Sequence, residues 1–347
     1  MDPVFFFELS GESKDMPKAE AERCVGAECA RHSIIGSGPG YLMASFPKEF
    51  LSGIADRIAL THSIGRYLGA YDPSDAGWLS EIQLPSGTFA IRGKRFEGMM
   101  KDVDSQKVIR DVGNILSKKN DVDLRDPDVV VRMHMSDKIH LFIEERAVDR
   151  NIMEKRKVGE RPFFSPISLH PKYARALINL TGAKKGNTVL DPFCGTGGVV
   201  IEAAEMGMKA IASDFDEEMV LGCRENMDFY GLKLHDFEVL DIADIPHRFS
   251  DIDIVVTDPP YGRSTKIGGD DVLGIHKSAM ASIPQVLRPN GRAGIILPYE
   301  TGPSTMGLDA VFRQHVHGSL SRHYHVFKKI NSINFHVDAT ESARAVL

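Results

Sequence analysis

The sequence predicts an α/β protein with a doubly wound parallel sheet in its C-terminal half and an α+β region before it. From about residue 170 onward, short apolar runs alternate with longer segments of helical periodicity. This alternation is typical of a parallel sheet with crossover helices. Before about residue 148, period-2 runs such as "VFFFEL" and "PDVVVRMHM" dominate, which favours a smaller unit with antiparallel strands.

Four segments follow one another along the 347 residues. Residues 1–50 alternate apolar runs with one helical stretch and are interpreted as a small α+β unit. Residues 51–147 contain "FAIRGKRFE", a polar helical stretch and two strands that meet in a hairpin around Ser136. Residues 148–168 are charged and then broken by prolines, as expected of a linker. Residues 169–347 form the α/β domain.

Within the α/β domain, the first predicted helix, "KYARALINLTG", ends at Gly182. Amphipathic helices separate the strands that follow. The predicted strands are 188–191, 209–214, 238–241, 253–258 and 293–298.

Composition limits the class of protein. A 42% hydrophobic and 26% charged chain is ordinary for a globular protein. No apolar stretch approaches a membrane span or a signal peptide. The four cysteines form no CxxC pair, so the cytoplasm is expected. The formal net charge of −6 argues against a nucleic-acid partner unless basic residues gather locally.

A glycine-rich turn, "LDPFCGTGG" at residues 190–198, joins the first strand of the α/β domain to its helix. Glycines such as Gly195 and Gly197 let a backbone turn tightly and approach a ligand. Dinucleotide and phosphate-loop signatures do not fit, because Val200 stands where the first needs glycine and no G-x-x-x-x-G-K-[ST] run exists. The alternative to a ligand-binding loop is a tight strand–helix turn that binds no ligand. Asp191 suits a ligand with a cationic group.

Acidic residues close the next two strands. Asp214 ends the second strand, where an acid is placed to accept hydrogen bonds from ribose hydroxyls. Asp216 fits a helix N-cap better. Asp241 closes the third strand and could accept from an adenine amine, or be a solvated acid. Together these positions describe a cationic, adenosine-bearing ligand without phosphates, and S-adenosylmethionine fits.

The fourth strand ends in "TDPPYG", residues 257–262. In a doubly wound sheet the first and fourth strands are neighbours, so Asp258 is expected beside the glycine-rich turn. The prolines stiffen the loop and leave the Pro259 carbonyl free of strand pairing. A carboxylate, a carbonyl and the ring of Tyr261 can then hold a planar amine and direct its lone pair at a methyl donor.

"DPFCGTGG" followed by "TDPPYG" resembles the Rossmann-fold amino-methyltransferases that act on nucleobases. "FAIRGKR" with "VDLRDPDVVVRMH" resembles the THUMP domain of RNA-modifying enzymes, here over 51–147. Nearly the whole chain is similar to the archaeal tRNA (guanine(10)-N2)-methyltransferases, which implies a ferredoxin-like piece at 1–50, then the THUMP domain, the linker and the catalytic domain. The resemblance implies transfer of one methyl group or two from S-adenosylmethionine to the N2 amine of guanosine 10 in tRNA. It implies cofactor contacts by Asp191, Cys194, Gly195, Thr196 and Gly197, with Asp214 on the ribose and Asp241 near the adenine, and an amine held by Asp258, Pro259, Pro260 and Tyr261.

The resemblance also places the segment "SPIS", residues 165–168, near the amino-acid end of the cofactor. Basic residues gather as an RNA partner requires. Segment 92–119 holds eight basic residues against four acids, and segment 146–161 holds six against three. They could follow RNA phosphates without reading bases. Arg92, Lys94 and Arg95 are the preferred patch, and a solvated face is the alternative for any single lysine.

Several alternatives stay open. The target could be another tRNA position or ribosomal RNA, the amine could be adenine N6, or the chain could be a silent RNA-binding subunit. DNA is not expected as substrate, and a small activating subunit is an open partner. Pairs such as His323 and His325 lack cysteines or acids at ligand spacing, so no metal is expected. Residues 326–330, "VFKKI", predict an antiparallel edge strand protected by lysines.

Overall fold

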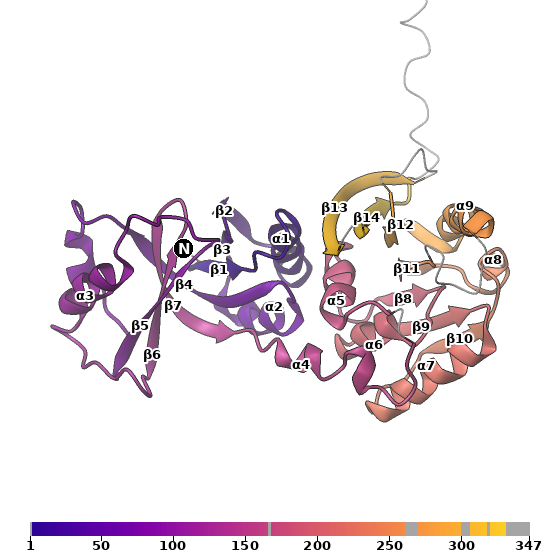
Figure 1. Cartoon of the computed structure of the whole chain (residues 1–347), viewed down its shortest axis with the longest axis horizontal. Helices are drawn as coiled ribbons and strands as arrows, with labels where there is room; N and C mark the ends of the chain where they lie inside the picture. Colours follow the sequence, from indigo (N-terminus) through magenta and orange to yellow (C-terminus); the bar gives the residue numbers. More distant parts are fainter. Residues whose placement is uncertain (1, 166–167, 261–268, 300–305, 318–319, 331–347) are drawn as a thin grey trace, which may run out of the picture. The chain divides into compact units, whose positions relative to one another are not determined.

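The computed structural model describes residues 2–165, 168–260, 269–299, 306–317 and 320–330. The chain forms two compact units, Met1–Arg156 and Lys157–Leu347, each built on its own seven-stranded sheet (Figure 1). Within the described ranges, no helix is both long and apolar enough to cross a membrane. The first unit is α+β and the second is a doubly wound α/β fold, as the sequence predicts.

The first unit has the strand order β2-β3-β1-β4-β7-β6-β5. Its central strand β4 pairs antiparallel with β1 on one side and with β7 on the other. One sheet therefore runs through residues that the sequence assigns to 1–50 and to 51–147. The hairpin around Ser136 is confirmed, since β6 and β7 pair antiparallel across it. The strands are β1 (Val4–Leu9), β2 (Ser33–Gly38), β3 (Tyr41–Ser45), β4 (Thr61–Tyr71), β5 (Phe89–Arg95), β6 (Val129–Met135) and β7 (Ile139–Ala147).

Alternation along β1 divides its side chains between two faces of the sheet. Phe5 and Phe7 belong to the core under α1 and α2, whereas Phe6 stacks with Tyr41 and Phe142 in a separate cluster. A further core lies under α3. The helices of this unit are α1 (Met16–Glu28), α2 (Leu51–Arg57), α3 (Ser105–Leu116) and α4 (Asn151–Glu154), with short 3-10 turns η1 (Lys48–Phe50) and η2 (Gly77–Glu81).

The second unit has the strand order β10-β9-β8-β11-β12-β14-β13. The pairs from β10 to β12 are parallel, and β14 joins β12 and β13 antiparallel. The order reverses between β8 and β11, the neighbours that the sequence predicts. The strands are β8 (Thr188–Asp191), β9 (Lys209–Asp214), β10 (Asp236–Val239), β11 (Ile252–Thr257), β12 (Leu287–Leu297), β13 (Gly307–His317) and β14 (Leu320–Lys328).

Helices cover this second sheet, and one buried core joins Leu190 of β8, Val255 of β11 and Ile283 of α9. Asp216 caps α7, because its carboxylate accepts from the Glu218 backbone N–H at 3.0 Å. The predicted cap is thereby confirmed. The helices are α5 (Pro171–Leu180), α6 (Gly198–Glu205), α7 (Glu217–Phe229), α8 (Ile245–Arg248) and α9 (Gly269–Val286), after the turn η3 (Val158–Glu160).

Two details of the second sheet differ from the sequence prediction. The run from Val326 belongs to β14, which lies between β12 and β13, so β13 rather than this run is the edge strand. The apolar pattern indicated an antiparallel strand but carried no information on strand order. In addition, β10 ends at Val239, and Asp241 lies in the turn beyond it.

Gly65 in β4 allows a close backbone approach. A Cβ atom there would lie 2.1 Å from the Ile143 carbonyl oxygen of β7, and a backbone atom in a paired strand has little room to yield. We expect G65A to lower the free energy of unfolding by about 1–3 kcal/mol or more in urea titrations. G77A is the matched control, because nothing lies within 4 Å of a Cβ at Gly77. Equal stability of the two variants would contradict this account.

Candidate active site

The carboxyl ends of β8 and β11 meet at the point where the strand order reverses. Val189 pairs with Ile254, and Leu190 pairs with Val255, which brings the residues that follow each strand to one edge. The Thr257 hydroxyl donates to Asp191 Oδ1 at 2.7 Å. The two predicted motifs, 190–198 and 257–262, are therefore joined directly at the position where open α/β sheets bind ligands.

The glycine-rich turn is held from β9. Gly195 and Gly197 have φ angles of +47° and +86°, which glycine adopts without strain. The Cys194 backbone N–H donates to the Ser213 carbonyl at 2.9 Å, and the Gly195 N–H donates to Asp214 Oδ2 at 3.0 Å. Asp214 thus braces the turn, and its carboxylate oxygens keep lone pairs for a further donor.

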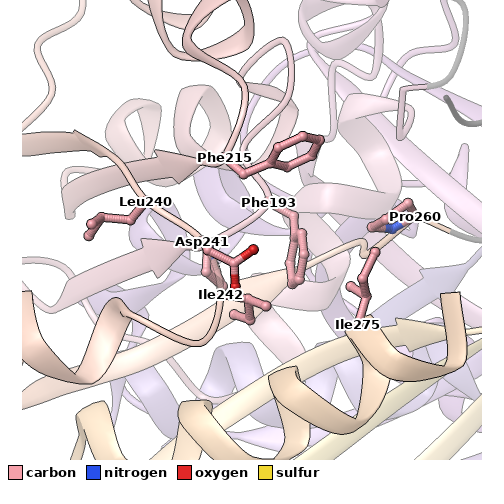
Figure 2. A pocket seen from close by; sticks show the side chains of 8 residues that line it. Phe193, Phe215, Leu240, Asp241, Ile242, Pro260 and Ile275 are labelled. Atoms are coloured by element: carbon pink, nitrogen blue, oxygen red, sulfur yellow. The ribbon is translucent and has the colours of Figure 1, made fainter. Parts of the chain in front are cut away.

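A mostly apolar pocket lies beside this turn (Figure 2). The Asp241 carboxyl group is near the rings of Phe193 and Phe215, and Pro260 borders the same space. Phe215 is 56% exposed, so its ring is accessible to a flat ligand. An apolar slot with one carboxylate suits an aromatic ring that carries an amino group. The lining residues are Pro192, Phe193, Phe215, Leu240, Asp241, Ile242, Pro260 and Ile275.

Buried carboxyl groups give this edge its electrostatic character. Burial raises the pKa of Asp191 to about 7, even though Thr257 and the Phe193 N–H donate to it. Burial also raises the pKa of Asp258 to about 7, against the positive charge of Arg322. Among the described residues, Asp258 Oδ1 is buried without a hydrogen-bond partner. Such an atom marks a place for a donor that the described residues do not supply.

Cys194 is buried, and its contact with the Cys223 thiol together with burial raises the pKa of Cys194 well above its ordinary value. A thiol kept neutral in this way is a poor nucleophile. Within the part of the chain that the structure describes, no group of three or more His, Cys, Asp or Glu side chains could hold a metal ion.

Sequence reasoning missed Asn226 and Arg161, two of the residues that brace Thr196. Asn226 on α7 is fully buried and donates to the Thr196 carbonyl at 2.9 Å and to the Phe163 carbonyl at 2.7 Å. Arg161 and Ser168 both reach the Thr196 hydroxyl, at 3.0 and 2.9 Å. These contacts tie Arg161, Phe163 and Ser168, the last of which belongs to the "SPIS" segment, to the turn. They join positions far apart along the chain, so no local pattern could have revealed them.

Other predicted site residues are only partly placed. Tyr261, and Pro166 and Ile167 of the "SPIS" segment, lie outside the described residues. Asp258 is the first residue after β11, and Pro259 and Pro260 come next.

The predicted basic patch lies on β5 and is engaged within its own unit. Arg92 donates to the Leu124 carbonyl at 2.5 Å, and Lys94 lies 3.4 Å from Glu8 Oε1. Arg95 donates to the backbone carbonyls of Met100 and Val103. Arg92 and Lys94 remain exposed, whereas Arg95 is half-buried.

Comparison with known proteins gives two family matches. Residues 158–315 match the RMKL-like methyltransferase domain, and residues 78–144 match the THUMP domain. The chain is 32% identical to tRNA (guanine(10)-N2)-dimethyltransferase of Methanothermobacter thermautotrophicus, over 93% of this chain and 98% of that protein. It is 33% identical to the enzyme of the same name from Pyrococcus abyssi, over 94% and 99%. The crystal structure of TrmN from Thermus thermophilus shares the fold, with a TM-score of 0.55, 22% identity and coverage of 94% and 100%.

The raised pKa of Asp258 predicts a pH-dependent stability. The carboxyl has a pKa of about 7 in the folded protein against 3.8 as a free side chain. Its contribution to folding is therefore undiminished below pH 4 and is lost as pH rises toward 7. At pH 8 we expect D258N to be more stable than the wild type by on the order of 1–4 kcal/mol, with the difference shrinking toward pH 4.

Urea unfolding of the second unit at several pH values measures this difference. Exposed Asp244, at the start of α8, provides the control variant D244N. A D258N advantage that did not change with pH would show that the Asp258 carboxyl ionises normally.

Proposed function

The chain belongs to the family of tRNA (guanine(10)-N2)-dimethyltransferases, and from this premise we propose that it methylates the exocyclic N2 amine of guanosine 10 in tRNA. The methyl donor is S-adenosylmethionine. One observation carries the proposal at the level of chemistry. Oδ1 of Asp258, which is buried and has no hydrogen-bond partner among the residues that the structure describes, lies beside a glycine-rich turn, after the strand that neighbours β8.

The residues at the edge of the sheet fit the cofactor. We assign the adenine to the pocket of Phe193 and Phe215, with Asp241 accepting from its amine. Asp214 is assigned to the ribose hydroxyls. Asp191 faces the cationic end, where a nearby positive charge would restore its ionised form. Cys194, Gly195, Thr196 and Gly197 form the turn that the cofactor follows. When bound, S-adenosylmethionine supplies an electrophilic methyl group on a sulfonium.

The acceptor site is assigned to the loop after β11. The Asp258 carboxylate and the Pro259 carbonyl accept the two N–H groups of the guanine amine, and Tyr261 stacks on the base. Holding both hydrogens turns the nitrogen lone pair out of conjugation with the ring. Such positioning can lower a barrier by about 7–11 kcal/mol. The proline rings fix the φ angles of Pro259 and Pro260, which limits movement of these residues when the substrate binds.

Asp258 also accepts the proton that the amine nitrogen loses in the reaction. As the nitrogen–methyl bond forms and the sulfur–methyl bond breaks, positive charge grows on nitrogen, and the carboxylate stabilises it. The nitrogen then gives one proton to Asp258, whose raised pKa suits an acceptor near neutral pH. Guanosine methylated once keeps one N–H, which the same acceptors can hold for a second transfer.

The first unit is assigned to the tRNA. We propose residues 51–147 as the THUMP domain, 1–50 as the ferredoxin-like piece before it, 148–168 as linker and 169–347 as the methyltransferase domain. Arg92 and Lys94 are exposed on β5 and are proposed to contact tRNA phosphates, with Arg95 holding the adjoining turn. Phosphate contacts would make binding salt-dependent.

Methyl transfer to an unmodified tRNA transcript tests the function. With labelled S-adenosylmethionine, we expect label in N2-methylguanosine and N2,N2-dimethylguanosine of the digest. A transcript with adenosine in place of guanosine 10 should take up no label. Label in N6-methyladenosine would move the enzyme to the adenine class, and label retained by the second transcript would move the modified position.

Asp258 variants test the acceptor site. D258A removes an amine acceptor and the proton acceptor, so we expect a loss of at least about 1,000-fold in transfer rate, since positioning and charge stabilisation are both lost. Cofactor affinity, measured by calorimetry, should stay within about threefold because Asp258 is not among the residues assigned to the cofactor. Equal losses of rate and affinity would mean that Asp258 binds the cofactor instead.

A further inference from the structure

His276 hydrogen-bonds to the acceptor loop, which is the segment from Asp258 to Pro260 after β11. We call this contact, together with the contact of His276 to Tyr299, the His276 clasp, and no sequence motif predicts it. His276 lies on α9, is only 2% exposed, and has both ring nitrogens engaged. Its Nε2 lies 3.0 Å from the Pro260 carbonyl oxygen, and its Nδ1 lies 2.9 Å from the Tyr299 hydroxyl. Tyr299 follows β12, so His276 connects α9 and the segment after β12 to the loop after β11.

The chemistry of the partners determines the tautomer. A carbonyl oxygen can only accept, so Nε2 of His276 must carry the proton that bonds to Pro260. In the neutral ring Nδ1 is then an acceptor, and the Tyr299 hydroxyl donates to it. Burial lowers the pKa of His276 and keeps the ring neutral. With both nitrogens occupied, the imidazole is not poised to act as a general base.

This clasp completes the stiffening of the loop. The proline ring already fixes φ of Pro260, and a hydrogen bond to its carbonyl limits ψ as well. The same bond takes up one lone pair of the Pro260 carbonyl oxygen, and Asp258 and Pro259 are the acceptors proposed for the amine. The neighbouring Ile275 lines the pocket that Pro260 also borders. One turn of α9 therefore contacts both the pocket and the loop.

We propose that His276, oriented by Tyr299, is a positioning residue that presets the acceptor loop for the amine. The inference rests on the proposed function, because it presupposes an amine held after β11. Holding the loop affects the methyl-transfer step more than cofactor binding.

Substitutions at residue 276 separate positioning from packing. We expect H276A to slow single-turnover methyl transfer to tRNA by about 10–100-fold, since small misplacements near a reacting centre have effects of this size. H276Q places an amide N–H near the Nε2 position and should recover most of the rate. H276N places its amide near Nδ1 and should not. Y299F should lose about 3–10-fold, the effect of one hydrogen bond.

Two controls are measured together with the methyl-transfer rates of these variants. The affinity for S-adenosylmethionine should stay within about threefold in each variant, and H235A, at an exposed site, should match the wild type. A wild-type rate in H276A would overturn the inference. So would an equal loss in the Gln and Asn variants, or a loss of cofactor affinity as large as the loss of rate. If H276A fails to fold, the difference in methyl-transfer rate between H276Q and H276N still tests the inference.

The tautomer of the His276 imidazole can be measured independently of catalysis. In a long-range proton–nitrogen NMR spectrum with labelled histidine, the signal that H276Q lacks should show an imidazole protonated at Nε2. An active wild type whose His276 is protonated at Nδ1 would contradict only the inference. An inactive wild type with the expected tautomer would contradict the proposed function instead.

Discussion

The parallel pairing of β8 with β11 is the constraint on which the site depends. It aligns two strands whose paired residues, such as Val189 and Ile254, are more than 60 residues apart along the chain. Both strands therefore end at the same edge of the sheet. The 2.7 Å bond from Thr257 to Asp191 then joins the two loops that follow. Every other feature of the site is arranged around this junction. The turn is held by β9 and α7, the loop is held by α9, and the pocket lies between them.

Buried acids behave differently in the two units, and their partners explain why. Glu8 in the first unit is 1% exposed, yet Arg132 at 2.6 Å and Lys94 more than offset its desolvation, so its pKa is lowered. Asp258 is also desolvated, and the charge of Arg322 does not offset that desolvation, so its pKa is raised. The first arrangement stabilises the folded chain. The second lowers the stability of the ligand-free chain at neutral pH, and it suits the proposed ligand, which brings hydrogen-bond donors and positive charge.

Features set by neighbouring residues could be predicted from the sequence. The parallel strands β8, β9, β11 and β12, the cap at Asp216, and the positions of Asp191, Asp214 and Asp258 at or just after strand ends follow from local patterns and the topology of doubly wound sheets. Contacts between distant positions could not. The bond from Asn226 to Phe163 spans 63 residues, and the clasp of His276 depends on how α9 packs. The place of β14 inside the sheet also depends on strand order, which hydrophobic alternation does not encode.

The continuous sheet of the first unit has a consequence for how the chain folds as it is synthesised. β1 pairs with β4, but the other edge of β4 is completed only by β7, which ends at Ala147. Until that strand leaves the ribosome, β4 presents eleven residues of open strand edge, a surface on which other chains can aggregate. Folding of this unit therefore waits for nearly its whole length. A nascent chain arrested before residue 139 would be a substrate for chaperones rather than a folded intermediate.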